Sequence, residues 1–109
     1  MKRGDLIVVA LRGDYGKPRP ALVVQADHFN DTHASVTVIP VTSTIIDAPL
    51  FRLVVEPGPG NGLRSLSQLM IDKVATVSRD RAGAAIGRVE EDVLVRVNRA
   101  LALWLGIAP

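Results

Sequence analysis

Short apolar runs separated by turn-forming residues dominate the first 80 positions of this chain and constrain its fold most strongly. The runs are rich in β-branched residues and span 6–11, 21–25, 36–41 and 50–55. Runs of this length and composition predict β-strands. Clusters of Gly, Pro, Asn and Asp lie between them, as in 57–62. Because the strands are short and closely spaced, we expect a small, strongly bent sheet or barrel.

Two further runs complete the strand pattern. A longer run, 68–77, is interrupted near its middle by Asp72 and Lys73, which predicts a bend or a bulge in a long strand. The segment 84–89, which contains Gly87, is predicted to form a last short strand. The β part of the domain is therefore expected to extend to about residue 89.

The apolar pattern changes its period after residue 89. Apolar residues then recur every three to four positions, the period of a helix with one buried face, at Val93, Leu94, Val97, Ala100, Leu101, Trp104 and Leu105. Acidic residues at 90–92 occupy the first turn, where the helix dipole favours anions, and Gly106 is placed to end the helix. The sequence predicts a C-terminal amphipathic helix of about four turns, packed on the sheet within one domain over 1–109.

Composition limits the kinds of protein that this chain can be. It has no cysteine, which excludes a disulfide framework and a thiolate metal site and fits a reducing cytoplasm. No apolar run approaches the ~18 residues of a membrane span, so we expect a soluble, cytoplasmic protein without a membrane partner. Hydrophobic residues make up 48% of the 109 positions, which predicts burial of apolar surface against a second copy or a partner.

The net charge of +2 is unevenly distributed. Residues 1–20 carry a net +3 and residues 73–109 a net +2, whereas the middle of the chain carries −3. Ten of the 13 cationic residues are arginine, whose planar guanidinium binds phosphate oxygens in pairs. If the two ends of the chain lie together in space, they form a basic face suited to a nucleic-acid backbone.

The signature motifs of many enzyme classes are absent from the sequence. It contains no G-x-S-x-G, no glycine-rich phosphate loop followed by Lys and no H-E-x-x-H. The only histidines, His28 and His33, lie five positions apart in a predicted polar turn and are interpreted as solvated loop residues. Neither a metal site nor a cofactor is therefore expected.

A conformationally restricted arginine is the most distinctive polar feature. Pro18 fixes its own φ at about −65°, and Pro20 drives Arg19 toward an extended conformation. The backbone under Arg19 is therefore stiff before any ligand binds. A guanidinium held in this way is suited to stabilise charge that develops in a transition state. It could equally pair with a nearby carboxylate and fix a loop.

Three consecutive hydroxyl-bearing residues, Thr42, Ser43 and Thr44, follow the predicted strand 36–41. Their hydroxyls are suited to donate to phosphate oxygens or to a ribose hydroxyl. They could equally form a local turn by bonding to their own backbone. The residue types leave both roles open.

Several short segments, taken in order, resemble the MazF/PemK family of toxin ribonucleases. They are Arg3-Gly4-Asp5, RPALVVQ at 19–25, IPVTS at 39–43, DKVATV at 72–77 and GRV at 87–89. The resemblance covers essentially the whole chain. It implies an α+β, mainly β fold: a small SH3-like barrel of the CcdB/PemK type with a C-terminal helix. It also implies a homodimer, a cognate antitoxin, and metal-independent cleavage of single-stranded mRNA at short sequence motifs through the 2′-hydroxyl.

The resemblance assigns the family's catalytic arginine to Arg19 and its catalytic threonine to Thr42. Tyr15 is a candidate platform for base stacking, with a turn aromatic that covers the end of the barrel as the alternative. The remaining candidate RNA contacts are Ser43, Lys17, Lys73 and Arg79. For Lys17 and Arg79, solvated surface charge is the alternative. No residue is assigned as the general base.

Two departures from the family pattern affect the expected RNA contacts. Lys73-Val74-Ala75 stands where the family often has Gln-x-Arg, and the loop before Arg19 is short. The ending Trp104-Leu105-Gly106-Ile107 resembles the Trp-Gly-Ile ending of CcdB, a DNA gyrase poison of similar architecture without nuclease activity. That poison and a non-catalytic SH3-like binding module are the alternatives. Neither needs Arg19 together with Thr42, so that pair favours the ribonuclease.

Overall fold

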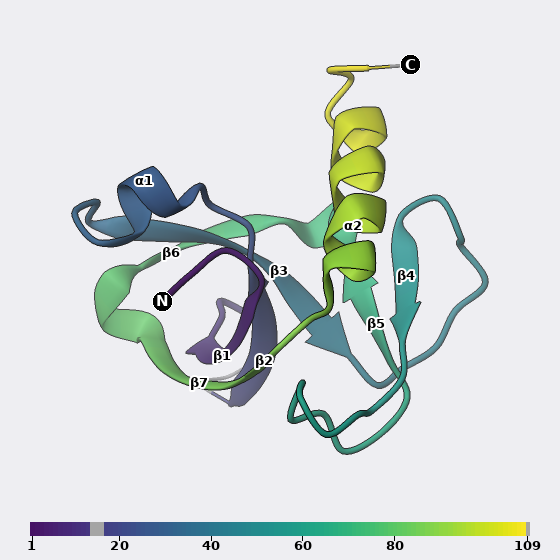
Figure 1. Cartoon of the computed structure of the whole chain (residues 1–109), viewed down its shortest axis with the longest axis horizontal. Coiled ribbons are helices and arrows are strands. Elements are labelled where there is room, and N and C mark those ends of the chain that lie inside the picture. Colours follow the sequence, from purple (N-terminus) through teal and green to yellow (C-terminus); the bar gives the residue numbers. More distant parts are fainter. Residues whose placement is uncertain (14–16, 109) are drawn as a thin grey trace.

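The computed structural model describes residues 1–13 and 17–108 (Figure 1). Its elements in chain order are β1 (Asp5–Ala10), β2 (Pro18–Val23), α1 (Asp27–Asn30), β3 (Ser35–Thr42), β4 (Arg52–Val55), β5 (Ser67–Met70), η1 (Ile71–Lys73), β6 (Ala75–Ser78), η2 (Arg79–Arg81), β7 (Ala82–Arg88) and α2 (Glu91–Trp104). The fold is mainly β with a C-terminal helix, as the sequence predicts.

The strand β3 organises the sheet. One edge of β3 pairs with β2 through residues 38–40, and the other edge pairs with β6 through 35–38 and with β5 through 41–42. All of these pairings are antiparallel, as are β1 with β2, β1 with β7 and β4 with β5. Each half of β3 thus has a different partner on its second edge, and Thr42 at the end of β3 pairs with β5.

The bend predicted in 68–77 is confirmed. The 3₁₀ turn η1 separates β5 from β6, so that this one stretch of chain pairs with both ends of β3. Two details of the prediction are wrong. The predicted strand 50–55 begins only at Arg52, and Leu50 is 66% exposed. The predicted polar turn around His28 contains the one-turn helix α1, which is too short to give a periodic signal.

The sheet is barrel-like but not closed. The strand order runs β4-β5-β3-β2-β1-β7, and β4 and β7 do not pair with each other within the described residues. The loop between β4 and β5 fills this opening, because the Arg88 amide donates to the Gly60 carbonyl at 2.9 Å. Gly62, at φ 72°, lies so close to Ile86 that an added Cβ would overlap the Ile86 carbonyl. The predicted small, strongly bent sheet or barrel is thus an open, strongly curved sheet bridged by a loop.

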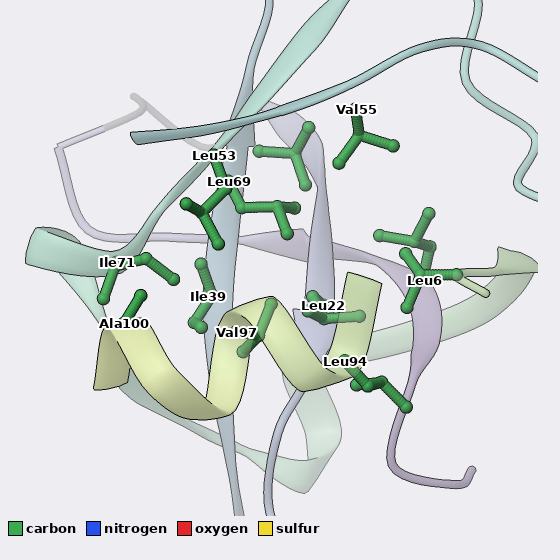
Figure 2. Close-up of a cluster of buried hydrophobic side chains, with 12 residues drawn as sticks. Leu6, Leu22, Ile39, Leu53, Val55, Leu69, Ile71, Leu94, Val97 and Ala100 are labelled. Atoms are coloured by element: carbon green, nitrogen blue, oxygen red, sulfur yellow. The ribbon is translucent and has the colours of Figure 1, made fainter. Parts of the chain in front are cut away.

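Two apolar clusters occupy the two faces of this sheet. Residues from β1, β2 and β3 alternate between the clusters, as the pleat of a strand requires. The cluster that packs against α2 (Figure 2) comprises Leu6, Leu22, Ile39, Val41, Leu53, Val55, Leu69, Ile71, Val89, Leu94, Val97 and Ala100. The other comprises Ile7, Val9, Ala21, Val23, Val36, Val38 and Val77. Because both faces are covered, these strands are continuous apolar runs rather than alternating ones.

The helix α2 buries one face on the sheet through Leu94, Val97 and Ala100. Burying a side chain such as Val97 completely contributes about 1.5–3 kcal/mol. Gly106 ends the helix as predicted, at φ 72°, and the Ile107 amide donates to the Ala102 carbonyl at 2.9 Å. Neither α2 nor any other described helix is long and apolar enough to cross a membrane.

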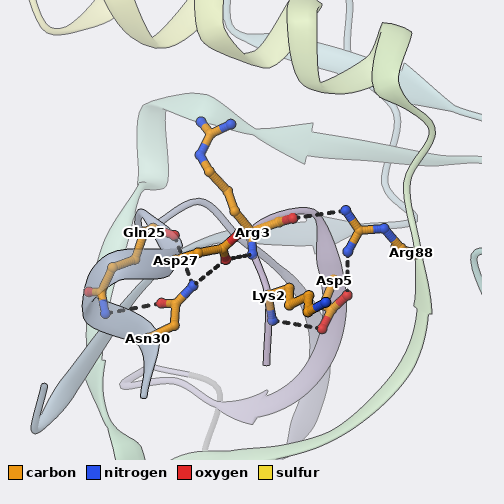
Figure 3. Close-up of polar contacts among 7 residues, drawn as sticks. All are labelled: Lys2, Arg3, Asp5, Gln25, Asp27, Asn30 and Arg88. Atoms are coloured by element: carbon orange, nitrogen blue, oxygen red, sulfur yellow. Dashed lines mark hydrogen bonds and ion pairs between the residues drawn. The ribbon is translucent and has the colours of Figure 1, made fainter. Parts of the chain in front are cut away.

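A polar network ties the N-terminus to α1 and β7 (Figure 3), and one further bond ties it to α2. Asp27 accepts hydrogen bonds from the Arg3 amide and from Asn30, and Asp5 forms an ion pair with Arg88 at 2.8 Å. The Arg3 guanidinium donates to the Val24 carbonyl and to Asn98 of α2. The Arg3-Gly4-Asp5 segment therefore anchors the start of the sheet.

Candidate active site

Two open grooves meet at Arg19 and Thr42. The first has a volume of about 900 Å³ and is lined mainly by the ends of β1, β5, β6 and η2. The second, of about 910 Å³, is lined by β2, the segment after β3 and the loop 62–67. Gly13, Arg19 and Thr42 line both grooves. These volumes are at the upper end of the ~300–1,000 Å³ typical of ligand sites.

The register of β2 and β3 explains why Arg19 and Thr42 lie together. Ala21 and Pro40 form the last pair of this ladder, and Arg19 and Thr42 each lie two residues beyond it, at the same end of the two strands. The sequence spacing between 19 and 42 is therefore a consequence of one antiparallel pairing.

The Arg19 side chain is half-buried and oriented by the backbone of β3. Its Nη1 donates to the Val41 carbonyl at 3.4 Å, a long hydrogen bond. Pro20, one residue beyond the last pair of the ladder, has no N–H to offer to that strand. The guanidinium is thus directed toward the end of β3, and its backbone is fixed by pairing with Val9 of β1.

The three hydroxyl-bearing residues at the end of β3, Thr42, Ser43 and Thr44, form a local turn, one of the two roles considered for them from the sequence. The Thr44 amide donates to Thr42 Oγ1 at 3.1 Å. This bond uses acceptor capacity of Oγ1 and leaves the hydroxyl hydrogen for another partner. Thr42, Ser43 and Thr44 all line the second groove, so turn formation and ligand contact are compatible.

Cationic residues concentrate along both grooves. Seven of the chain's 13 lysines and arginines line one groove or both: Arg12, Lys17, Arg19, Arg52, Arg64, Lys73 and Arg81. No Asp or Glu among the described residues lines either groove. Cations of the N-terminal region (Arg12, Lys17 and Arg19) and of the C-terminal region (Lys73 and Arg81) therefore lie along the same two grooves, which form a surface suited to a phosphate backbone.

Arg52, which lines the first groove, has a close carboxylate partner in Asp72. Its Nε and Nη2 donate to the two Asp72 oxygens at 2.8 and 3.1 Å, and both side chains are mostly buried. The hydrogen bond from Arg52 holds the pKa of Asp72 below its ordinary value. Asp72 thus neutralises a charge that would otherwise face the first groove.

The chain matches a known protein family and its members over almost its whole length. The family model described as "PemK-like, MazF-like toxin of type II toxin-antitoxin system" matches residues 2–105. The chain belongs to this family. It is 52% identical over 109 residues, 99% of each chain, to a "Probable endoribonuclease MazF" of Mycolicibacterium smegmatis. It is 30% identical to "Endoribonuclease MazF9" of Mycobacterium tuberculosis, over 98% of both chains.

Solved structures agree with the family assignment. The toxin resembles an "Endoribonuclease in complex with its cognate antitoxin from Mycobacterial species" with a TM-score of 0.80 and 26% identity. The similarity covers all of this chain and 98% of that one. The overall architecture of the toxin is therefore that of the solved endoribonuclease.

The predicted site residues of the toxin fall into three groups. Lys17 and Ser43 line the second groove and Lys73 lines the first, so the structure brings them to the predicted catalytic pair. Arg79 lines neither groove. Its Nε donates to the His33 carbonyl at 2.8 Å and its amide donates to the Ala34 carbonyl, which fixes η2 to the start of β3. Tyr15 lies outside the described residues.

Sequence reasoning did not single out several polar residues that line the grooves of the toxin: Arg12, Arg52, Arg64, Thr76, Ser78 and Arg81. Thr76 and Ser78 alternate with the buried Val77 along β6, so the two-residue period of that strand could have identified them. The arginines lie at strand ends and in loops, where no period applies. Within the described residues there is no group of three or more His, Cys, Asp or Glu side chains placed to hold a metal ion.

Proposed function

We propose that the toxin is a metal-independent endoribonuclease that cleaves single-stranded mRNA at short sequence motifs and thereby inhibits growth. The observation that carries the proposal is that Arg19 and Thr42 both line two grooves rich in cations, at the point where these grooves meet. An RNA strand that crosses this point has its phosphates next to basic residues on both sides. The names of the relatives, which are endoribonucleases, support the same activity.

The geometry supports cleavage through the neighbouring 2′-hydroxyl. The 2′-oxygen attacks phosphorus, the bond from phosphorus to the 5′-oxygen breaks, and the products are a 2′,3′-cyclic phosphate and a 5′-hydroxyl. Arg19 stabilises the added negative charge on the transition state, an effect of about 10²–10³ in rate for one preorganised donor. Thr42 donates its hydroxyl hydrogen, which the bond from Thr44 leaves available, to a phosphate oxygen or to the 2′-oxygen.

The proton of the 2′-hydroxyl goes to neither of these residues. A guanidinium is too weak an acid to serve as a base, and neither is a threonine hydroxyl a base at neutral pH. No His, Asp or Glu among the described residues lines the grooves. The proposal therefore assigns charge stabilisation and orientation to this pair and assigns no general base.

The other predicted RNA contacts have different roles in this proposal. Lys17 and Lys73, one in each groove, bind phosphates on opposite sides of the scissile bond. Ser43 donates to the strand in the second groove. Tyr15 is proposed to stack on a base. The two hydrogen bonds of Arg79 to the segment 33–34 support a structural role rather than an RNA contact for that side chain.

Partners follow from the family and from the surface. A solved relative is named as a complex with its cognate antitoxin, and we propose such an antitoxin for this toxin. Large apolar side chains remain roughly half-exposed or more at the end of α2, namely Leu103, Trp104, Leu105 and Ile107. Exposure on this scale supports a homodimer. A substrate of mRNA and the lack of cysteine support a cytoplasmic location.

The direct test is cleavage of a single-stranded RNA pool by the purified toxin in EDTA. We expect cleavage to persist in EDTA and to leave 2′,3′-cyclic phosphate ends. A substrate with 2′-deoxyribose at the cleaved nucleotide is expected to remain intact. Cleavage of that deoxy substrate, or a requirement for added metal, would refute the mechanism.

A pair of variants separates this function from that of a gyrase poison. Arg19→Ala is expected to fold and to lose growth inhibition, whereas Trp104→Ala is expected to retain it. Trp104 packs on Phe51 with ring centroids 5.4 Å apart, which gives it a structural role. The opposite result, with Arg19→Ala toxic and Trp104→Ala harmless, would favour the gyrase poison. The comparisons give that alternative no support.

A further inference from the structure

Gln68 is a buried polar residue in a strand that is otherwise part of the core. It lies in β5, where every residue is buried, and is 2% exposed. Burying an amide costs free energy unless its donors and acceptors are hydrogen-bonded. Gln68 does not line either groove and so does not reach the substrate path. The hydrogen bonds that Gln68 makes within the protein must therefore offset the cost of burying its amide.

The Gln68 amide brackets one residue of the segment that follows β3. Its Oε1 accepts a hydrogen bond from the Ile46 amide at 3.2 Å, and its Nε2 donates to the Ile46 carbonyl at 2.8 Å. This is the pattern by which a residue of a neighbouring strand would pair with Ile46. The side chain thus acts as a substitute strand partner where the chain leaves the sheet.

Apolar packing holds this segment only weakly. Ile45 and Ile46 are 45% and 42% exposed, and residues 43–47 belong to no strand. A segment with exposed apolar side chains and few backbone partners belongs to the least stable part of a fold. The bracket from Gln68 is therefore a principal restraint on the position of residues 43–47.

This restraint acts on the proposed catalytic pair. Gln68 faces Thr42 in the β3–β5 register, and its bracket at Ile46 holds the chain two residues beyond Thr44, whose amide binds Thr42 Oγ1. The next pair in the register is Val41 with Leu69, and the Val41 carbonyl accepts from Arg19. One short strand, β5, thus supports both the hydroxyl and the guanidinium side of the site.

We propose that Gln68 is a positioning residue for RNA cleavage, which fixes the hydroxyl turn 42–44 through its bracket on Ile46 without touching the substrate. The inference rests on the proposed ribonuclease function. A misplacement of about 1 Å in a catalytic group lowers the rate of the chemical step by up to about a hundredfold. Loss of the bracket therefore lowers kcat and leaves KM, which depends on the groove cations, nearly unchanged.

The first experiment compares Gln68→Met with Gln25→Met. Methionine has a similar length and shape but cannot form the two hydrogen bonds to the backbone of Ile46. Gln25 lies away from the grooves and is a related control, because it also accepts from a backbone amide, that of Thr37 at 3.2 Å, and donates to a backbone carbonyl, that of Ser35 at 3.1 Å. Steady-state cleavage of one RNA oligonucleotide that the wild-type toxin cuts is measured for all three proteins, together with the melting temperature.

Gln68→Met is expected to lower kcat about tenfold to a hundredfold with KM changed less than about threefold. Gln25→Met is expected to lower the melting temperature by a similar amount but to change kcat less than about twofold. Hydrogen exchange of the Thr44 and Ile46 amides is expected to speed up in Gln68→Met alone. A Gln68→Met toxin that keeps wild-type kcat, or that loses kcat only as much as Gln25→Met does, would overturn the inference.

A second variant tests the bracket by its chemistry and covers the case in which Gln68→Met is poorly folded. In Gln68→Glu the ionised carboxylate accepts from the Ile46 amide but repels the Ile46 carbonyl, whereas the protonated carboxyl restores both bonds. Burial raises the pKa of such a group. The kcat of Gln68→Glu relative to wild type is therefore expected to rise as the pH falls from about 8 to about 5. A ratio that is constant or that falls would count against the bracket.

These outcomes are distinguishable from failure of the proposed function. If the wild-type toxin cuts no RNA, the ribonuclease proposal is wrong and the inference falls with it. If the wild-type toxin cuts RNA and the Gln68 variants match the Gln25 control, the ribonuclease proposal stands and the positioning role is refuted.

Discussion

The replacement Asp72→Asn is expected to weaken the fold and to strengthen RNA binding. Asp72 binds Arg52 through two hydrogen bonds, at 2.8 and 3.1 Å, and the two side chains are only 17% and 11% exposed. Asparagine has the same shape, but its amide group cannot accept both bonds and carries no charge. The replacement therefore leaves the Arg52 guanidinium in place at the first groove without its counter-charge.

The stability cost lies between that of an exposed and a buried ion pair. Exposed pairs contribute about 0–1 kcal/mol, and breaking a fully buried pair costs about 3–5 kcal/mol. Because water reaches this pair in part, we expect Asp72→Asn to lower the free energy of unfolding by about 1–2 kcal/mol. For a domain of this size each kcal/mol lowers the melting temperature by roughly 4–8 °C.

RNA binding is expected to change in the opposite direction. A released guanidinium adds a phosphate contact, which at low salt tightens binding by about two- to fivefold. One more contact to a single strand also steepens the dependence of log K on log salt by about 0.7. Fluorescence anisotropy with a 2′-deoxy oligonucleotide, measured between about 50 and 200 mM salt, gives both quantities without cleavage.

Asp5→Asn is the matched control for this prediction. It removes the partner of Arg88, also at 2.8 Å, in a pair that lines neither groove. We expect this control to lower stability without changing the salt dependence of binding. Weaker RNA binding by Asp72→Asn, or an unchanged salt slope, would refute the reasoning that Asp72 masks a groove cation.

Three further predictions follow from the same structure. Arg19→Lys keeps the charge but loses the planar donors, so it should retain less than about a tenth of wild-type kcat; full activity would show that a point charge suffices. Gly62→Ala places a Cβ against the Ile86 carbonyl in a left-handed conformation and should lower the melting temperature more than Gly60→Ala, which meets nothing within 4 Å. Hydrogen bonds from the Arg3 amide and from Arg52 hold the pKa values of Asp27 and Asp72, respectively, below 3.8. The stabilisation of the fold by these carboxylates is therefore present above about pH 4 and is lost as the pH falls through the lowered pKa values. In an acid titration of unfolding, Asp72→Asn should lose less stability than the wild type.

The sequence predicts much of the fold because most of its strands are short apolar runs with clear boundaries. The exceptions have physical causes. The four-residue helix α1 covers only about one helical turn, which is too short for a repeating pattern, and the side-chain bonds of Asn30 to the Gln25 carbonyl and to Asp27 hold it in place. The opening between β4 and β7 depends on how the loop 56–66 packs, and loop packing leaves no periodic signal in the sequence.

The candidate site was only partly predictable for similar reasons. The flanking prolines single out Arg19, but its proximity to Thr42 depends on the pairing of β2 with β3, which a single sequence does not specify. Arg81 and Arg64 reach the grooves because of turns that no local pattern determines. Gln68 lies within an apolar run, where a polar residue suggests an interruption of the strand rather than a bracket on a segment 22 positions away.

The position of Arg19 shows how the site obtains rigidity without deep burial. Pro18 and Pro20 remove N–H donors from β2, so its pairing with β3 extends only as far as Pro40. The Val41 carbonyl, just beyond the last pair, instead accepts from Arg19 itself. The same prolines therefore stiffen the backbone of Arg19 and end the strand pairing that would otherwise cover it. A guanidinium at a strand end that is fixed in this way is already oriented when a phosphate arrives.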